Sequence, residues 1–514
     1  MAQTVKVGPG ERLQTTDTPS VDHEALIIGA GFGGIGAAIE LQRIGVEDFL
    51  IVEKASTAGG TWQANTYPGA AVDIPSVLYS FSYEQRADWS SLFAPAAELR
   101  AYAEDVVDKH RLRSKIRFGL TVHELRFDEE TDAWQVTVEQ AGEVSELTAR
   151  FVISGIGALE RPQLPDIEGI DSFAGKVIHT SRWDHDADLT GKRVACIGTG
   201  ASALQLIPEI APSVGHLDVY QRTPIWVAPK VNPTIGPVAK LVLSVPPVRD
   251  ALRAAGTVTL DVFGNAVFQH TLRPLQSALE TGLRAWMRRQ VTDRDVREAL
   301  LPGYAFGCKR PSMSNTYLKA FNRPHVDLVT SPIRRITHSA IETEDGIRHP
   351  ADILIAATGF KIMDPHEPVP FPIYGRDGVE LGKWWLENRF QSYQGVSVVG
   401  FPNLFSIAGP YGFVVGSYFW MIEATTRHAA RVIAETRRRG ATRAEIRKEP
   451  HDEFVERMRR RQAGSPLFGP LCAGSNTYYV NFQGDSPLRP SLYGEMWWEN
   501  RFFPIHDYRY RRPS

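Results

Sequence analysis

Four glycines near the N-terminus stand where a chain would bring its backbone close to a phosphate group. They follow the apolar run 25–28, precede an alanine-rich helical pattern, and are Gly29, Gly31, Gly33 and Gly34. A second apolar run, "DFLIVEK", carries Glu53 near its end. Strand, G-x-G-x-x-G turn, helix and strand in this order predict a dinucleotide site, with the pyrophosphate at the helix N-terminus and the acid on a ribose hydroxyl. The alternative is a turn that only packs helix on strand, and Glu53 counts against it.

The same pattern returns in "KRVACIGTGASALQLIPEI", where Gly198-x-Gly200 follows an apolar run and opens a helix. The next β-rich run ends with Arg222 and Thr223 instead of an acid. An arginine at that point suits a ribose 2′-phosphate and favours NADPH over NADH, unless it stands there by chance. The other residues assigned to this second site are Thr199, Ser202 and Gln205.

The spacing of the two turns predicts the domain organisation. The runs 151–159 and 351–360 each couple a buried strand to a glycine, and they predict where the chain leaves the first unit and returns to it. We expect an α/β protein with two Rossmann-like dinucleotide-binding domains, the first for FAD and the second, inserted in it, for NADPH. The expected parts are an arm over 1–21, the FAD domain over 22–160, the NADPH domain over 161–350, and the rest of the FAD domain with a tail over 351–514.

Helical periods and several prolines interrupt the strand–helix alternation over about 236–300. This stretch predicts a helical subdomain that shapes a cleft, and a role at a membrane surface is the alternative. Net charge is −2 over 514 residues, which gives no field of one sign to favour nucleic acid. No apolar leader or stretch of membrane-spanning length is present in the sequence. We therefore expect a cytoplasmic protein without stable membrane insertion, either a monomer or a weak homo-oligomer.

Three cysteines are present and are far apart in the sequence: Cys196, Cys308 and Cys472. They form no C-x-x-C pair, which disfavours a disulfide framework, a zinc site and a dithiol reductase. No metal site is expected.

Two longer motifs surround the glycine turns. The stretch "FAGKVIHTSRWD" contains Phe173, Gly175, His179, Trp183 and Asp184 at the spacing F-x-G-x-x-x-H-x-x-x-W-D. The stretch "GGTWQANTYPGAAVD" contains Gly60, Trp62, Tyr67, Pro68, Gly69 and Asp73. With both motifs, the chain resembles the type I Baeyer–Villiger monooxygenases of the class B flavoprotein monooxygenases, over residues of roughly 22 to 500.

The resemblance implies an enzyme that uses FAD, NADPH and O2 on a small-molecule ketone. One oxygen atom would be inserted beside the carbonyl through a C4a-peroxyflavin, giving an ester or lactone. Arg310 in "FGCKRPSMSN" is implied as the catalytic arginine, Asp73 as the acid that orients it, and His179 as a residue of domain movement and cofactor positioning. Further residues implied to contact the cofactors are Gly60, Thr61, Trp62, Tyr79, Lys309, Gly409 and Tyr478, the last standing where the family often has tryptophan.

Two other functions compete with ketone oxidation. A monooxygenase of the same fold that oxygenates nitrogen or sulfur would not need Arg310. A redox-silent nucleotide-binding or scaffold protein would need only the glycine turns. The substrate itself is not encoded in any one motif, because pockets of this kind are built by loops from several segments.

Overall fold

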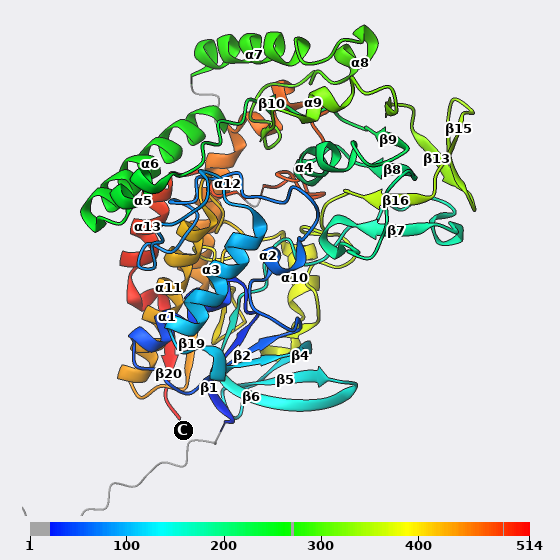
Figure 1. The fold of residues 1–514 in the computed structure, drawn as a ribbon. Helices are drawn as coiled ribbons and strands as arrows, with labels where there is room; N and C mark the ends of the chain where they lie inside the picture. The colour runs from blue at the N-terminus through cyan, green and yellow to red at the C-terminus, as the bar shows by residue number, and fades with distance from the viewer. Residues whose placement is uncertain (1–20, 269–271, 487, 514) are drawn as a thin grey trace, which may run out of the picture.

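The computed structural model describes residues 21–268, 272–486 and 488–513. Nearly all of the N-terminal arm expected over 1–21 therefore lies outside the described residues. Two α/β units stand side by side, each with helices packed around a sheet; the sheet of the first unit is mixed and that of the second is parallel (Figure 1). Each unit has its own apolar core.

The first sheet has eight strands, and β1 (His23–Ile28) lies at its centre between β6 and β2, parallel to both. Ile27 of β1 pairs with Ile51 and Ile153 and is fully buried, as expected of a continuous apolar run covered on both faces. Helices α1 (Phe32–Arg43) and α11 (Tyr418–Arg438) pack against each other in this unit. The other strands are β2 (Phe49–Glu53), β3 (Ile116–Phe118), β4 (Leu120–Asp128), β5 (Ala133–Gln140), β6 (Glu143–Ser154), β17 (Ile373–Tyr374) and β18 (Leu404–Ser406).

The second sheet is parallel throughout and has the order β12, β9, β8, β16, β7. The second glycine turn of the chain joins β8 (Arg193–Ile197) to α4 (Ala201–Ile210) in this sheet. Strand β16 (Ile353–Ala356) lies inside this sheet, so the boundary predicted at residue 351 falls too early: the chain rejoins the first sheet only at β17. A buried parallel strand followed by glycine looks the same in either sheet, which explains the misplacement. The remaining strands are β7 (Lys176–His179), β9 (His216–Tyr220) and β12 (Val326–Val329).

Among the described residues, four helices occupy the stretch expected to be helical. In Figure 1 they lie along the outer edge of the molecule (green). Arg253 ties α6 to the first unit by donating to the carbonyl oxygens of Val77 and Ser80 at 2.6 and 2.9 Å. The outer faces of these helices expose apolar side chains, such as Val238 (76% exposed) and Leu241 (70%). No described helix is long and apolar enough to cross a membrane. The four are α5 (Pro237–Leu243), α6 (Pro246–Phe268), α7 (Arg273–Arg288) and α8 (Arg294–Ala299).

Smaller elements complete the fold and fix its tail. The short parallel pair β10 (Val227–Ala228) and β11 (Ser312–Met313) joins distant segments of the second unit. The antiparallel pair β19 (Arg443–Ile446) and β20 (Tyr508–Arg511) returns the C-terminal end to the first unit. The others are α2 (Thr61–Ala64), α3 (Ala96–Lys109), α9 (Tyr317–Ala320), α10 (Leu381–Asn388), α12 (Lys448–Ala463), α13 (Tyr493–Phe502), β13 (Ile333–Ile336), β14 (Ala340–Thr343) and β15 (Arg348–Pro350).

Candidate active site

The first glycine turn is too tight for side chains. A Cβ on Gly34 would lie 1.8 Å from the carbonyl oxygen of Gly29, which itself has a left-handed φ of 95°. Gly31 is the N-cap of α1, and a Cβ on the neighbouring Gly60 would lie 2.9 Å from its Cα. At Gly33, a predicted contact residue, a Cβ would lie 3.5 Å from Cγ2 of Ile407, an ordinary van der Waals contact. The N-terminus of α1 thus presents bare backbone, the surface that a pyrophosphate needs, and the residues fit a dinucleotide.

Glu53 is buried at the end of β2, and its carboxylate supports the turn directly. Oε2 accepts a hydrogen bond from the backbone N–H of Ala30 at 2.7 Å, and Oε1 accepts one from Ala55 at 2.8 Å. Each carboxylate oxygen has a further lone pair, so the predicted contact with a ribose hydroxyl stays chemically open. Glu53 therefore fixes the turn as well as standing at the predicted ribose position.

The segment after Gly60 builds the wall beside this turn. Thr61 opens the short helix α2, and the indole Nε1 of Trp62 donates to the Tyr79 hydroxyl at 3.3 Å. The two rings meet edge to face with centroids 5.6 Å apart. Gly409, the predicted contact on the returning segment, lies between two residues with left-handed φ, Ala408 (51°) and Tyr411 (61°). Non-glycine residues in this region are held there by their surroundings, which is typical of functional loops.

Arg310 and Asp73 form a two-point ion pair across the two units. Arg310 donates from Nε to Oδ2 of Asp73 at 2.9 Å and from Nη2 to Oδ1 at 2.5 Å. The side chains are 41% and 30% exposed, so the guanidinium is accessible. The charge of Asp73 raises the pKa of Arg310 well above its usual value, which keeps the cation protonated. The contact implied by the family resemblance is present, and the catalytic roles of the two residues stay predictions.

The β10–β11 pair explains how Arg310 reaches this position. Strand β11 begins two residues after Arg310, and its Ser312 pairs with Val227, five residues after Arg222. Lys309 is thereby brought close to Arg222: burial, and then the positive charge of Arg222, lower the pKa of Lys309. Two cations close enough for their charges to act on each other are suited to a phosphate dianion.

The second glycine turn differs from the first in one informative way. Gly198 has a φ of 112°, and a Cβ there would lie 2.5 Å from the carbonyl oxygen of Ala357, whereas a Cβ on Gly200 would meet nothing within 4 Å. The protein itself thus requires the first glycine and leaves open space above the second. Thr199 donates from its hydroxyl to the carbonyl oxygen of Thr223 at 3.2 Å and so joins the turn to the end of β9.

Helix α4 of the second unit also holds the segment that leads to Asp73. The Tyr67 hydroxyl donates to Oε1 of Gln205 at 2.8 Å, and Nε2 of Gln205 donates to the carbonyl oxygen of Ala71 at 2.9 Å. Ser202 also interacts with the Tyr67 hydroxyl. The structure thus uses Ser202 and Gln205 to join the two units, and their predicted contact with the coenzyme stays a prediction.

His179 ends β7 and is buried at the same junction. Its Nδ1 accepts from the backbone N–H of Ser181 at 3.2 Å, so Nε2 carries the proton and donates to the carbonyl oxygen of Gly359 at 3.0 Å. Burial lowers the pKa of His179, which favours this neutral form. Each ring nitrogen has a partner in the protein. His179 therefore holds the loop after β16, and its predicted part in domain movement and cofactor positioning stays a prediction.

The C-terminal tail lies over the arginine. Tyr479 is buried, Tyr478 is 47% exposed, their rings lie 4.6 Å apart, and both are close enough to Arg310 to raise its pKa. Asn476 donates from Nδ2 to the Thr223 hydroxyl at 2.7 Å. Tyr478, standing where the family often has tryptophan, is thus placed beside the candidate catalytic residue.

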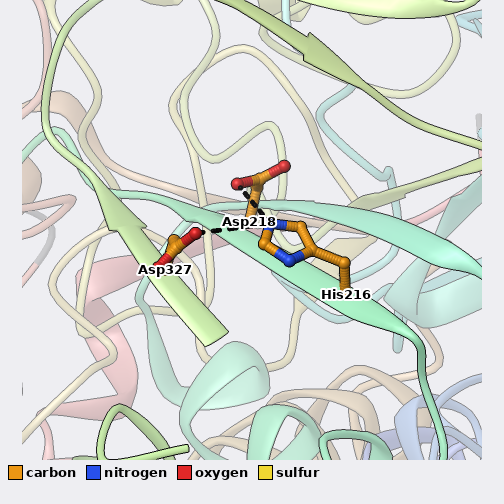
Figure 2. A group of neighbouring side chains, drawn as sticks. All are labelled: His216, Asp218 and Asp327. Carbon is orange, nitrogen blue, oxygen red and sulfur yellow. Dashed lines mark hydrogen bonds and ion pairs between the residues drawn. The ribbon is translucent and has the colours of Figure 1, made fainter. Parts of the chain in front are cut away.

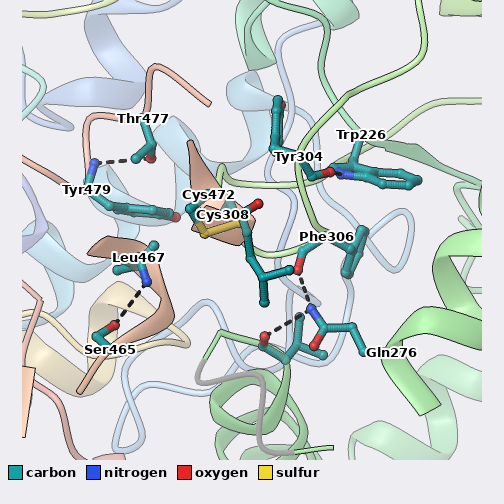
Figure 3. Close-up of a disulfide and its surroundings, with 12 residues drawn as sticks. Trp226, Gln276, Tyr304, Phe306, Cys308, Ser465, Leu467, Cys472, Thr477 and Tyr479 are labelled. Atoms are coloured by element: carbon teal, nitrogen blue, oxygen red, sulfur yellow. Dashed lines mark hydrogen bonds between the residues drawn. A yellow bond between two sulfur atoms is a disulfide. The ribbon is translucent and has the colours of Figure 1, made fainter. Parts of the chain in front are cut away.

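Cys308 and Cys472 form a disulfide next to this tail (Figure 3). The expectation from the cysteine spacing was therefore wrong. The two residues are 164 positions apart, and local spacing carries no information about such a pair. The backbone N–H of Ala305 donates to the carbonyl oxygen of Leu471 at 3.0 Å and aligns the two segments.

One group of side chains with metal-ligand chemistry lies elsewhere in the described residues. His216 Nε2 is 3.3 Å from Asp218 and 3.4 Å from Asp327 (Figure 2). His216 begins β9, at the opposite end of that strand from Arg222. A histidine between two carboxylates is accounted for by ion pairing, and the group takes no part in the candidate site.

Three participants were missed at the sequence level. Lys230 lies close enough to Asp73 for their charges to interact, although burial lowers the pKa of Lys230 overall. Asn476 and Cys472 belong to the tail, and Cys308 is joined to the tail by the disulfide. None of them belongs to a motif with its partner nearby, so no local signal marked them.

Two nucleotide-binding units with a fixed arginine between them define a flavin- and nicotinamide-type oxidoreductase. A family model described as pyridine nucleotide-disulphide oxidoreductase matches residues 26–244. A Baeyer–Villiger monooxygenase of Streptomyces coelicolor is 34% identical over 499 residues, 95% of this chain and 92% of that protein. One of Pseudomonas aeruginosa is 36% identical over 87% of this chain and 84% of that protein. A crystal structure of OTEMO in complex with FAD and NADP has a TM-score of 0.82 at 28% identity, covering 96% of this chain and 100% of that one.

The chain belongs to the Baeyer–Villiger monooxygenase family. This finding confirms the resemblance seen in the two long motifs, and the structural match confirms the fold class of two Rossmann-like domains.

Proposed function

We propose that this chain uses FAD, NADPH and O2 to insert one oxygen atom beside the carbonyl of a small-molecule ketone, giving an ester or lactone. The observation that carries the proposal is the two-point ion pair between Arg310 and Asp73. A guanidinium held in one orientation is a fixed cation, and oxygen insertion into a ketone develops negative charge on oxygen. A nitrogen- or sulfur-oxygenating enzyme of this fold would have no such requirement.

FAD, when bound, supplies the redox chemistry with NADPH and O2, and the chain orients the reactants. Arg310 holds its proton throughout, because Asp73 raises its pKa, so it stabilises negative charge without acting as an acid. Removal of one such preorganised donor typically costs about 3–4 kcal/mol of barrier.

The coenzyme specificity follows from the other two cations. We place the 2′-phosphate of NADPH between Arg222 and Lys309, whose charges already act on each other. Thr223 stands beside them at the end of β9 and offers its hydroxyl. A ribose hydroxyl in the same place would gain far less from the two cations, so NADH is the poorer coenzyme.

The decisive test is the yield of product per NADPH oxidised in Arg310→Ala. The flavin should still be reduced by NADPH, hydrogen peroxide should replace the ester, and ester yield should fall about 10²- to 10³-fold. Arg323→Ala, an exposed arginine on the same stretch, is the matched control and should keep the wild-type yield. Wild-type ester yield from Arg310→Ala would overturn the proposal and favour oxygenation of nitrogen or sulfur.

We also propose that the enzyme acts in the cytoplasm, since its reaction consumes NADPH, and that it is a monomer or weak homo-oligomer. Light scattering on a size-exclusion column at two protein concentrations tests the second statement. A stable oligomer at both concentrations would contradict it.

A further inference from the structure

The disulfide joins the two segments that the proposed reaction needs together. Cys308 stands two residues before Arg310, and Cys472 stands four residues before Asn476, which contacts Thr223. The two Cα atoms are 5.1 Å apart, and both side chains are buried. In the described part of the chain this is the one covalent link between the tail and the loop that carries the arginine (Figure 3).

Two backbone hydrogen bonds lie next to the disulfide in the sequence. Ala305 bonds to Leu471 through the backbone, and Cys472 donates its own N–H to Gly469 at 3.1 Å. Beyond Tyr479, the tail is attached to the first unit by polar contacts, such as Arg389 Nε to Asp485 at 2.7 Å. Without the covalent link, the tail would be held over Arg310 by such hydrogen bonds, each contributing about 0.5–1.5 kcal/mol net, and by the packing of Tyr479 and Leu467.

We propose that Cys308 and Cys472 form a reversible redox tether that controls how well NADPH oxidation is coupled to oxygen insertion. As a disulfide, the pair keeps Tyr478 and Tyr479 over Arg310. As two thiols, it releases the tail, and Tyr478 and Tyr479 no longer stay beside Arg310. This inference rests on the proposed function, because coupling is defined by the ketone product.

The chemistry of the switch is balanced by a reactant that the proposed reaction itself supplies. A reduced pair reacts with one hydrogen peroxide: one thiolate displaces hydroxide from the peroxide to give a sulfenic acid, and the second thiolate displaces the hydroxyl group, forming the S–S bond and two waters in total. Hydrogen peroxide is the product of uncoupled turnover, so an enzyme that oxidises NADPH without forming ester makes the oxidant that re-forms its disulfide. A cellular dithiol reverses the step by thiol–disulfide exchange and is itself oxidised to a disulfide.

The test compares oxidised and reduced wild-type holoenzyme. The protein is treated with dithiothreitol, freed of it by gel filtration under nitrogen, and its thiols are located by non-reducing peptide mass spectrometry. We expect the reduced form to yield at least about threefold less ester and correspondingly more peroxide per NADPH, since the tail's effective concentration at the loop falls. Chymotrypsin should also cleave the tail over 464–486, which contains no lysine or arginine but offers Phe468, Tyr478, Tyr479 and Phe482, at least about threefold faster in the reduced form.

Cysteine variants distinguish the effect of losing the disulfide from a general loss of structure. Cys308→Ser and Cys472→Ser should each behave as the reduced wild type and ignore dithiothreitol, whereas Cys196→Ala, at the free buried cysteine, should respond as the wild type does. Added hydrogen peroxide should restore coupling to the reduced wild type and not to either serine variant.

The outcomes distinguish this proposal from the proposed function. If no ketone yields an ester in any redox state, the function fails, while redox-dependent tail cleavage still supports the tether. The tether is overturned if the purified protein neither contains nor forms the Cys308–Cys472 bond with peroxide. It is equally overturned if reduction, proven by mass spectrometry, changes neither tail cleavage nor peroxide release.

Discussion

Asn476 in the tail donates a hydrogen bond to Thr223 at the end of β9, over a distance of 2.7 Å. Asn476 has a left-handed φ of 48°, so Asn476→Gly removes the side chain without backbone strain. We expect this change and Thr223→Val each to raise the KM for NADPH about two- to tenfold, the usual range for one net hydrogen bond. The double variant should be no worse than either single one. Additive losses in this cycle would show that the two residues act separately.

Arg222→Ala should discriminate between the two nicotinamide coenzymes. Loss of one charged contact to a phosphate should lower the affinity for NADPH about ten- to a hundredfold, while the affinity for NADH stays nearly unchanged. Flavin reduction followed at a series of coenzyme concentrations gives both dissociation constants. Equal losses for NADPH and NADH would place the 2′-phosphate elsewhere.

Gly200→Ala should report on the coenzyme alone. The added methyl group meets no protein atom within 4 Å, so the fold and the flavin content should match the wild type, whereas binding of NADPH weakens because the pyrophosphate needs that space. Gly34→Ala is the contrasting variant, because its Cβ would clash with Gly29 and the protein should be purified without flavin. Unchanged NADPH affinity in Gly200→Ala would mean that the coenzyme does not approach this turn.

His179→Ala should keep its flavin but produce ester more slowly, since the loop after β16 loses the donor to Gly359. His179→Gln, which retains an N–H donor, should recover part of the rate. Stopped-flow flavin reduction and product formation are measured separately. Wild-type values for both in the alanine variant would make His179 a packing residue only.

His428 should make the protein sensitive to acid. It is buried between Asn500 and Tyr508, and burial lowers its pKa to about 3 from 6.5. Below pH 6.5 the unfolded chain binds a proton that the native state does not, so stability falls from there down to about pH 3. Between pH 7.5 and 5 this histidine alone costs about 2 kcal/mol of unfolding free energy.

His428→Gln should therefore lose about 2 kcal/mol less than the wild type over the same pH interval, as measured by urea unfolding. His366→Gln, at an exposed histidine, is the control and should show the full wild-type loss. If both variants lose as much as the wild type, His428 is not the titrating group.

Local sequence patterns predicted the parts of the fold that depend on local sterics. The two glycine turns and Glu53 could be assigned because strand, turn and helix follow one another within about thirty residues. Arg310 and Asp73 are 237 positions apart, and only a resemblance extending along the chain could pair them.

The features that were missed depend on which segments meet after folding. The disulfide and the contact of Asn476 with Thr223 arise because the tail crosses the second unit, and neither spacing nor composition encodes that path. The boundary at residue 351 was misplaced because the strand 353–356 has the burial pattern of a central parallel strand in either sheet.

The contact of Gln205 with Tyr67 and Ala71 restricts how such an enzyme can be recombined. A Cβ on Gly69 would lie 2.6 Å from the backbone oxygen of Gln205, so the two segments fit each other at the level of the main chain. A chimera that takes its nucleotide unit from another family member would have to carry both sides of this junction. Otherwise Asp73 would be displaced and would no longer orient the guanidinium of Arg310. The exchangeable module is therefore not the inserted domain alone but that domain together with residues 67–73.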